Sequence, residues 1–320
     1  MIHVAVIVIT YRRRGGLVKL LNALQEQRFP DPERRVRLTV IVVDNDAAGS
    51  AAAGVEPFRS SKTLAVRYVV EPTQGIPLAR NAGISALPDD AVFFCFIDDD
   101  EWPGATWVDE LLKTQRATAA DCILGAVIPV YPEGAPAWLI KSRLFESWRF
   151  ADQAPLKAAA SNNVLISTAF IRRTGHRFDE RMRMTGGSDY LFFRQAVALG
   201  MRIVWSAGAA VYEDVPASRL TLRWIVQRQY RLGNTFSVSE RIAGTRLGVV
   251  MWALKGVARV GLGVVMLPAL IFSPYYGMRS IIHLIRGAGT VAGAFGQIHR
   301  EYSPEGVARD RSGQYTDRRV

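Results

Sequence analysis

Three consecutive aspartates, Asp98, Asp99 and Asp100, directly follow an apolar run over residues 91–97. Seven apolar residues in succession predict a strand buried on both faces, which is typical of a parallel α/β sheet. Such sheets bind ligands at the carboxyl ends of their strands, where these carboxylates would lie. Because grouped carboxylates repel one another unless a cation joins them, we expect a divalent cation that arrives with a phosphate-bearing substrate. A solvated acidic turn is the alternative interpretation.

The elements that would position the triplet alternate between strands and helices over the first 130 residues. Buried strands are predicted at 4–9, 38–43, 64–70 and 91–97, and the leucines at 17, 20, 21 and 24 follow helical spacing. Pro77 opens a short helix that carries Arg80, and Pro103 is expected to start the helix that carries Trp107. This alternation predicts a mostly parallel sheet with right-handed crossovers, flanked by helices.

Polar residues end three of these four strands. They are the segments Thr10-Tyr11-Arg12, Asp44-Asn45-Asp46 and the aspartate triplet. The carboxyl ends of parallel strands share one edge of the sheet, so we expect the three segments to meet there.

The next part of the chain has a less regular pattern. Residues 122–130 and 162–166 are predicted strands, and residues 202–205 are predicted to form a short strand. The segment 129–148 is rich in Pro and Trp without a clean period, so it is predicted to be a long loop over the site. Gly186-Gly187-Ser188-Asp189 opens a predicted helix that ends near Gly200.

The composition favours a folded protein that binds polyanions. Of the 320 residues, 49% are hydrophobic, too many for a disordered chain, and the net charge is +11. This balance suits nucleic acid, anionic lipid or nucleotide phosphates. Cys95 and Cys122 lie in apolar strand-like runs and are expected to pack in the core in a reducing compartment. The apolar amino-terminal run has no basic residue before it and therefore predicts a strand, with no secretory signal apparent.

Five segments together resemble the family 2 glycosyltransferases of the GT-A fold. They are residues 6–12 (VIVITYR), 42–46 (VVDND), 74–81 (QGIPLARN), 96–100 (FIDDD) and 186–189 (GGSD), and they occur in the family's order. The resemblance covers roughly residues 1–232, and within the family the chain is most similar to bacterial exopolysaccharide and lipopolysaccharide sugar transferases, including the succinoglycan type.

The resemblance implies a nucleotide-sugar donor, with UDP as the expected nucleotide. The implied donor-binding residues are Thr10, Tyr11, Arg12, Asp44, Gln74, Arg80, Asp98 and Asp99. Asp98 and Asp100 match the family's Asp-x-Asp motif and are the implied ligands of Mg²⁺ or Mn²⁺. The family often has two acidic residues at positions 44 and 45, whereas this chain has Asn45. A surface arginine on a helix is the alternative interpretation of Arg80.

The resemblance also implies an inverting transfer in which Asp189 removes the proton from the acceptor hydroxyl. The family usually has Glu-Asp here, so Ser188 is a departure. Helix capping by Ser188, with Asp189 at the positive end of the helix dipole, is the alternative. Glu213 and Asp214 lie where many relatives carry a metal-binding histidine, and an ordinary loop is the other interpretation.

Two apolar stretches follow, at 247–272 and 281–298. The first is long enough to span a bilayer, but Lys255 and Arg259 share one helical face and favour a helix lying at the membrane surface. A true span, a re-entrant hairpin or a buried pair of core helices are alternatives. We therefore divide the chain into a catalytic domain (1–232), membrane-associating helices (233–300) and a polar tail (301–320).

The sequence thus predicts a metal-dependent hexosyltransferase that acts on a polyprenyl-diphosphate-linked oligosaccharide. We expect it at the cytoplasmic face of a bacterial inner membrane, building surface polysaccharide, with no nucleic-acid partner. A sugar nucleotidyltransferase and a catalytically inactive, membrane-bound nucleotide-sugar-binding module are the alternatives.

Overall fold

The computed structural model describes residues 1–31, 35–61, 64–146, 149–183 and 185–298. The predicted polar tail (301–320) lies outside the described residues, as does the end of the segment 129–148. The chain divides into two compact units. Unit 1 comprises residues 1–130, 145–180 and 192–214, and unit 2 comprises residues 131–144, 181–191 and 215–320.

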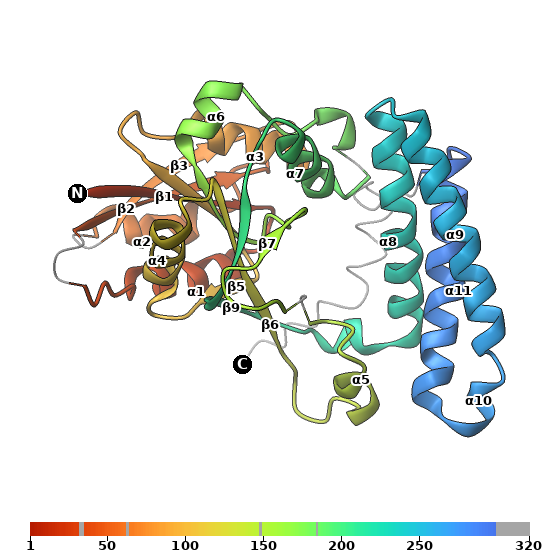
Figure 1. Ribbon diagram of the computed structural model, residues 1–320. Coiled ribbons are helices and arrows are strands. Elements are labelled where there is room, and N and C mark those ends of the chain that lie inside the picture. The colour runs from red at the N-terminus through yellow and green to blue at the C-terminus, as the bar shows by residue number, and fades with distance from the viewer. Residues whose placement is uncertain (32–34, 62–63, 147–148, 184, 299–320) are drawn as a thin grey trace. The chain divides into compact units, whose positions relative to one another are not determined.

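The elements of unit 1 include most of α7, and Figure 1 labels all of them except β4 and β8. They are β1 (Ile2–Thr10), α1 (Arg14–Gln25), β2 (Val36–Asp44), α2 (Ala52–Arg59), β3 (Ala65–Val70), α3 (Ile76–Ser85), β4 (Phe93–Asp98), β5 (Glu101–Pro103), α4 (Trp107–Thr118), β6 (Cys122–Val130), β7 (Pro155–Leu156), β8 (Asn163–Ser167), α6 (Thr168–Thr174), α7 (Ser188–Ala198) and β9 (Ile203–Asp214).

The remaining helices are mostly those of unit 2. They are α5 (Ala137–Ser142), α8 (Leu222–Ile242), α9 (Arg246–Met266), α10 (Ala269–Phe272) and α11 (Pro274–Ala294), with short 3₁₀ turns at Glu180–Met182 and Ala217–Leu220.

The sheet of unit 1 is mixed, and its longest pairings are parallel. Its strand order is β3-β2-β1-β4-β8-β6-β9-β5, with β7 beside β9. The first four strands run parallel, as the alternating pattern predicted, whereas β8 runs antiparallel to both β4 and β6. Because β2, β1 and β4 lie side by side and run in the same direction, their carboxyl ends form one continuous edge.

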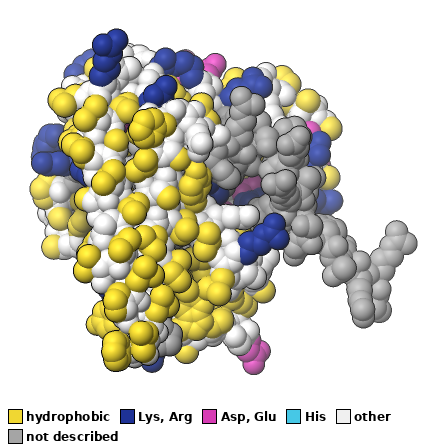
Figure 2. All heavy atoms as spheres, turned by 90° about the vertical axis from the view of Figure 1, so that its right-hand side faces the viewer, with side chains coloured by type: hydrophobic (Ala, Val, Ile, Leu, Met, Phe, Trp, Pro, Cys, Tyr) yellow, Lys and Arg dark blue, Asp and Glu magenta, His cyan; other side chains and the backbone are white. Residues whose placement is uncertain are grey.

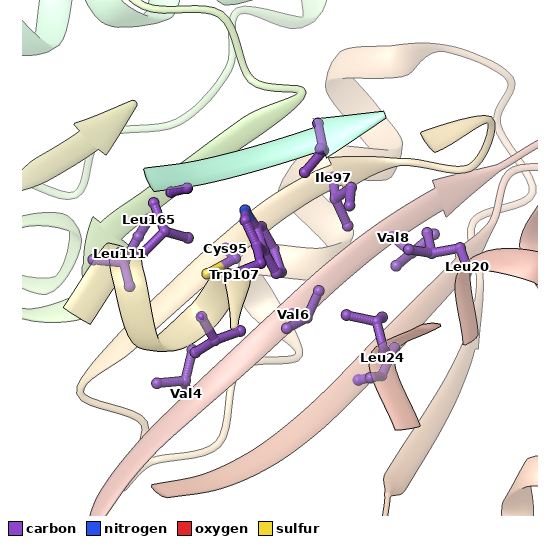
Figure 3. Close-up of a cluster of buried hydrophobic side chains, with 14 of the residues drawn as sticks. Val4, Val6, Val8, Leu20, Leu24, Cys95, Ile97, Trp107, Leu111 and Leu165 are labelled. Carbon is purple, nitrogen blue, oxygen red and sulfur yellow. The ribbon is translucent and has the colours of Figure 1, made fainter. Parts of the chain in front are cut away.

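Both faces of this sheet are covered, which explains the unbroken apolar runs in its strands. Val4, Val6 and Val8 of β1 pack with α1, α2 and α4, while Ala5 and Ile7 face a second core with α3, α6 and the end of α7. Figure 3 shows part of the first core, in which Trp107 lies close to Cys95. Both cysteines are buried and unpaired, as predicted.

Three local predictions were wrong. The segment 129–148 is not simply a loop, because it contains α5. The helix that carries Trp107 starts at that residue, whereas Pro103 ends the short strand β5, which pairs with β9. The predicted strand at 202–205 continues to Asp214 as β9. The run of Ser, Ala and Gly at 206–210 hid this continuation, because small residues carry little strand preference.

Three long helices of unit 2, α8, α9 and α11, pack side by side and form what we call the helical layer. Glycines let their backbones approach closely. A Cβ atom on Gly289 of α11 would lie 2.0 Å from the Tyr230 carbonyl oxygen of α8, and one on Gly256 of α9 would lie 3.1 Å from the Gly287 carbonyl oxygen of α11. Phe236 of α8 and Trp252 of α9 stack with their ring centroids 4.4 Å apart.

The alternative of a buried pair of core helices is wrong for α9. Within the described residues, α9 is the one helix long and apolar enough to cross a bilayer, and only 11% of that apolar window is buried. The capacity of α9 to cross a bilayer follows from its length and composition.

The glycine contacts make a testable prediction about the helical layer. Replacing Gly289 with Ala should lower the free energy of unfolding by about 1–3 kcal/mol, because the new methyl group would push α11 away from α8. Gly261→Ala on α9 is the matched control. Nothing lies within 4 Å of the position that its Cβ atom would take, so it should stabilise the helix by about 0.5–1 kcal/mol. Denaturant unfolding followed by circular dichroism measures both, and equal effects would contradict this packing.

Candidate active site

The ends of β1, β2 and β4 bring the three predicted polar segments to one edge of the sheet. In the parallel register Thr10 lies opposite Asp44, and Ile9 lies opposite Asp98. The prediction that these segments meet is therefore confirmed.

Hydrogen bonds and ion pairs hold the aspartate triplet. Asp99 accepts a hydrogen bond from the Thr10 hydroxyl at 2.7 Å and one from Arg13 Nη1 at 3.3 Å. The same Arg13 nitrogen donates to Asp100 at 2.7 Å. Asp98 lies 3.7 Å from Arg80 Nη2. Two guanidinium groups thus partly neutralise three carboxylates, so the alternative of a solvated acidic turn is wrong.

Arg80 is buried rather than a surface arginine of α3. Its side chain is 8% exposed, and the guanidinium carbon lies 5.3 Å from the centroid of the Phe178 ring. A buried cation requires anions nearby, and Asp98 is one of them. The position of Arg80 on the same face of α3 as apolar residues was the feature of the sequence that indicated its burial.

The amino end of α1 lies against the triplet. A Cβ atom on Gly16 would come within 2.3 Å of the Asp99 carbonyl oxygen, so only glycine fits at this position. The positive end of a helix dipole close to acidic side chains lowers the energy of their charged forms.

Two further carboxylates join the triplet, and one of them was missed by the sequence analysis. Glu101 of β5 is 1% exposed, accepts a hydrogen bond from the Asp98 backbone N–H at 3.1 Å and accepts another from Asn162 at 2.8 Å. Glu213 of β9 lies opposite Glu101, and its charge reaches Asp98. Glu213 is therefore not in an ordinary loop. The run of four acids at 98–101 was the available signal for Glu101.

This crowding changes the protonation of the acids. Burial, opposed by Arg80 and reinforced by neighbouring carboxylates, raises the pKa of Asp98 to about 7. Burial also raises the pKa of Asp99 to about 6, although Arg13 opposes the shift. Glu101 has a pKa well above its usual value because it is buried beside Asp98 and Asp100. Carboxyl groups with pKa values raised in this way cluster at functional sites.

The carboxylate oxygens suit Mg²⁺ or Mn²⁺ by their chemistry. Among the described residues, however, no group of three or more His, Cys, Asp or Glu side chains is arranged to hold a metal ion. A cation here would therefore use few protein ligands, with Asp98 and Asp100 the predicted ones, and would take its remaining oxygens from substrate and water. The predicted metal dependence stays a prediction.

Asp44 is fully buried at the end of β2 and holds the loop that follows. It accepts hydrogen bonds from the Tyr68 hydroxyl and the Ala51 N–H, both at 2.7 Å, and from the Asp46 N–H at 3.1 Å. These bonds give Asp44 a structural role beside its implied role in donor binding.

The hydrogen bonds of Asn45 explain why this chain has an amide where the family often has a second acidic residue. Its amide donates to the carbonyl oxygens of Glu71 and Thr73 at 3.0 and 2.8 Å and accepts from the Gly75 N–H at 2.7 Å. A carboxylate could not donate to two carbonyls, so this loop requires an amide. Asn45 thereby fixes the backbone at Gly75, which lies between the half-buried Gln74 and α3.

The residues after β1 are held in an uncommon conformation. Arg12 has a φ of 56°, which is rare for a residue other than glycine, and its Nε donates to Asp46 at 2.7 Å. The Arg12 guanidinium carbon lies 5.0 Å from the Tyr11 ring centroid. Backbone strain of this kind persists where the surroundings fix it, and it clusters at binding sites.

Asn163, at the start of β8, and the candidate Asp214 both have structural partners. Asn163 is fully buried, donates to the carbonyl oxygens of Ala126 and Ala209 and accepts from the Trp107 indole, all at 2.8 Å. Asp214 accepts from Lys19 Nζ at 2.6 Å.

Asp189 lies in the first turn of α7, within unit 2. Its carboxylate accepts a hydrogen bond from the Tyr190 N–H at 2.8 Å, and Gly187 beside it has a φ of 78°. The helix does begin at the predicted Gly-Gly turn. The role of Asp189 as a base stays a prediction.

Comparison with known proteins identifies the family. The profile described as "Glycosyl transferase family 2" matches residues 5–176, more than half of the chain. The chain belongs to glycosyltransferase family 2. It is 30% identical over 299 residues to "Succinoglycan biosynthesis protein ExoM" of Rhizobium meliloti (strain 1021), covering 92% of this chain and 94% of that protein. The chain is thus a glycosyltransferase, and the resemblance seen in its motifs is confirmed.

A solved relative confirms the GT-A fold. The crystal structure of Staphylococcus aureus TarS residues 1–349 matches with a TM-score of 0.52 and 19% identity, covering 94% of this chain and 93% of that one. The same protein, a poly(ribitol-phosphate) beta-N-acetylglucosaminyltransferase, is 25% identical over 66% of this chain and 35% of its own length. Structures of TarS with UDP and with UDP-GlcNAc are also similar. These comparisons give the nucleotidyltransferase alternative no support.

The raised pKa of Asp98 makes a prediction about stability. Its folded-state pKa lies above the unfolded value, so ionisation on raising the pH from about 4 to 7 destabilises the folded protein. Asp98→Asn should therefore raise the free energy of unfolding at pH 8 by about 1–2 kcal/mol, a figure reduced because solvent still reaches 39% of the side chain. The gain should disappear near pH 4.

Asp89→Asn provides the control for this prediction, because Asp89 is exposed in the turn before β4. It should leave unfolding unchanged from pH 4 to pH 8. If Asp98→Asn behaved in the same way, the described electrostatic conflict within the triplet would be wrong.

Proposed function

We propose that this glycosyltransferase transfers a sugar from a nucleotide-sugar, with UDP as the leaving group, to a hydroxyl group of a growing bacterial surface polysaccharide. The observation that carries the proposal is the carboxylate triplet at the carboxyl edge of the sheet, with Arg13 and Arg80 beside it. The similarity to a succinoglycan biosynthesis protein and to a protein crystallised with UDP-GlcNAc supports the choice of pathway and donor.

The donor diphosphate suits the mixture of charges at this edge. Arg80 can donate to phosphate oxygens, and its buried position fixes the direction of its guanidinium. Asp98 and Asp100 would hold Mg²⁺ or Mn²⁺, which neutralises the charge that develops on a leaving diphosphate. Asp44, Thr10, Tyr11, Arg12, Gln74 and Asp99 surround the same strand ends and complete the proposed donor site.

On the acceptor side, we assign Asp189 as the general base. Its carboxylate would take the proton of the attacking hydroxyl, so that the oxygen attacks the anomeric carbon as the diphosphate leaves on the opposite side. A single displacement of this kind inverts the anomeric configuration. The assignment rests on the match of residues 186–189 to the family motif.

The proposed acceptor is an oligosaccharide carried on a polyprenyl diphosphate at the cytoplasmic face of the bacterial inner membrane. The exposed apolar surface of α9 and α10 supports this part of the proposal. In this proposal, residues 1–232 carry out catalysis and residues 233–300 contact the membrane, as in the domain division made from the sequence.

Nucleotide binding should be selective. Thermal unfolding of the purified protein with UDP, GDP or dTDP, each with and without Mn²⁺, should show stabilisation by UDP that grows with Mn²⁺ and reaches about 2.7 kcal/mol at a hundredfold excess over Kd. If the melting temperature shifts equally with all three nucleotides, or with none, the proposed donor is wrong.

Replacing Asp189 with Asn should separate chemistry from binding. We expect turnover to fall by about 10²- to 10⁴-fold because the base is lost, while the UDP-induced thermal shift is kept. Glu133→Gln, an exposed acid in the segment before α5, is the control and should leave turnover unchanged. Unaltered turnover in Asp189→Asn would remove this residue from the mechanism.

A further inference from the structure

Cations dominate the helical layer of unit 2. Residues 222–298 contain nine Arg and Lys and one acid, Glu240. Glu240 is buried, where it accepts hydrogen bonds from the hydroxyl groups of Thr245 and Tyr190. From Arg241 to Ile298 the sequence has no Asp or Glu. The layer therefore carries a strong positive charge that its own side chains do not balance.

Three of these cations gather with a histidine in one place, which we call the basic cluster: Arg259, Arg279, His283 and Arg286. The last three lie at i, i+4 and i+7 on one face of α11, and Arg259 comes from α9. Burial first, and then the charges of the three arginines, lowers the pKa of His283. The charges of the three guanidinium groups therefore reach one imidazole, although these groups belong to two helices that pack along each other.

The basic cluster has unused capacity to bind an anion. Arg286 donates from Nε to Gln229 at 2.9 Å, and Gln229 is a neutral residue that is 2% exposed. Burial and the charge of Arg259 lower the pKa of Arg286 to about 10. His283 Nδ1 is buried without a hydrogen-bond partner in the described structure. Clustered guanidinium groups with planar, directional N–H donors are suited to phosphate.

In addition to the basic cluster, unit 2 has a broad apolar face, which is formed by α9 and α10. Leu247, Leu254, Val265, Ile271 and Phe272 are 66–85% exposed and extend along the whole length of the two helices. The opposite side of α9, at Gly248, Gly256 and Gly263, is buried against other helices of the layer. Figure 2 shows the apolar face, with Lys and Arg side chains mainly at its edges. An exposed apolar surface of this extent marks an interaction site.

The charge pattern selects the occupant of this face. A second copy of the chain would bring one basic rim against another and would be repelled. Passage of α9 through a bilayer is disfavoured because α9 packs along α11, which carries Arg279 and Arg286 and would take them into hydrocarbon. An anionic leaflet offers acyl chains to the apolar face and phosphates to the cations.

We propose that the helical layer lies in the headgroup region of an anionic membrane, with α9 and α10 toward the acyl chains and the basic cluster bound to a lipid phosphate. This inference rests on the proposed membrane contact of residues 233–300. It adds the side chains that make the contact and the lipid group that they bind. Each cation near a charged leaflet contributes roughly fivefold to partitioning. The cluster is thus a lipid-phosphate site with a defined set of donors.

Flotation of the full chain with vesicles tests this proposal. The vesicles contain phosphatidylcholine alone, phosphatidylcholine with phosphatidylglycerol, or phosphatidylcholine with a fatty acid. The fatty acid gives the same surface charge as phosphatidylglycerol, but every phosphate in those vesicles is neutralised by a choline cation. We expect the tightest binding to the phosphatidylglycerol vesicles. Equal binding to the fatty-acid vesicles would show attraction by charge alone and would overturn the phosphate site.

Substitutions identify the residues responsible. The double variant Arg259→Gln, Arg279→Gln should bind phosphatidylglycerol vesicles about 25-fold more weakly, and the corresponding Lys variant should recover part of that loss. Lys113→Gln with Lys157→Gln removes two exposed charges from unit 1 and is the control, expected to bind like the wild type. A double Gln variant that binds like the wild type would overturn the proposal.

The apolar face is tested with Leu254→Gln and Val265→Gln together, which should weaken binding to all three vesicles without loss of fold because both residues are exposed. Val92→Gln with Leu199→Gln changes two exposed apolar residues of unit 1 and is the control. If sedimentation instead shows a dimer that the first pair dissociates, while vesicles do not bind, the occupant is a second copy and the proposal fails.

Two further measurements separate the possible failures. The first is thermal unfolding with inorganic phosphate or pyrophosphate. If these ions stabilise the wild type but not the double Gln variant, and vesicles do not bind, the basic cluster is a site for soluble phosphate and the lipid assignment is overturned. UDP binding is measured on the same preparations. Loss of vesicle binding with UDP binding kept refutes only this inference, whereas vesicle binding without UDP binding refutes only the proposed donor.

Discussion

The repulsion among the carboxylates at the end of β4 is the constraint on which unit 1 depends. Asp98, Asp99 and Glu101 are forced together by a register that also places Glu213 opposite. Without compensation this arrangement would destabilise the sheet edge. Arg13, directly before α1, and Arg80 of α3 compensate this repulsion. Because α1 and α3 cover opposite faces of the sheet, a helix on each face is tied to the charge balance of the site.

The sequence was sufficient to predict the parallel half of the sheet. Apolar runs mark β1, β2 and β4 because these strands are buried on both faces, and the polar residues that follow them mark the edge that carries the candidate site. The strand β5 could not be predicted. It is three residues long, contains a proline and exists because β9 pairs with it, so its cause lies more than one hundred residues away in the chain.

The same distinction holds for the candidate site. The aspartates and Arg80 could be recognised by residue type and position, whereas the role of Asn45 could not. Its amide satisfies three backbone groups at residues 71, 73 and 75, and no local pattern shows that these groups converge on one side chain. The cluster of Arg259 with three residues of α11 was hidden for the same reason, because two separate helices build it.

The position of Arg13 has a consequence for ligand exchange. This guanidinium already bridges Asp99 and Asp100, so it occupies the electrostatic position that an incoming cation would need. Any metal bound by Asp100 must compete with an internal cation of the same chain, and its apparent affinity includes the free energy of releasing that arginine. Once released, the Arg13 side chain is available to an anion. In the proposed mechanism, the site would therefore favour a metal and a diphosphate that arrive together over either one alone.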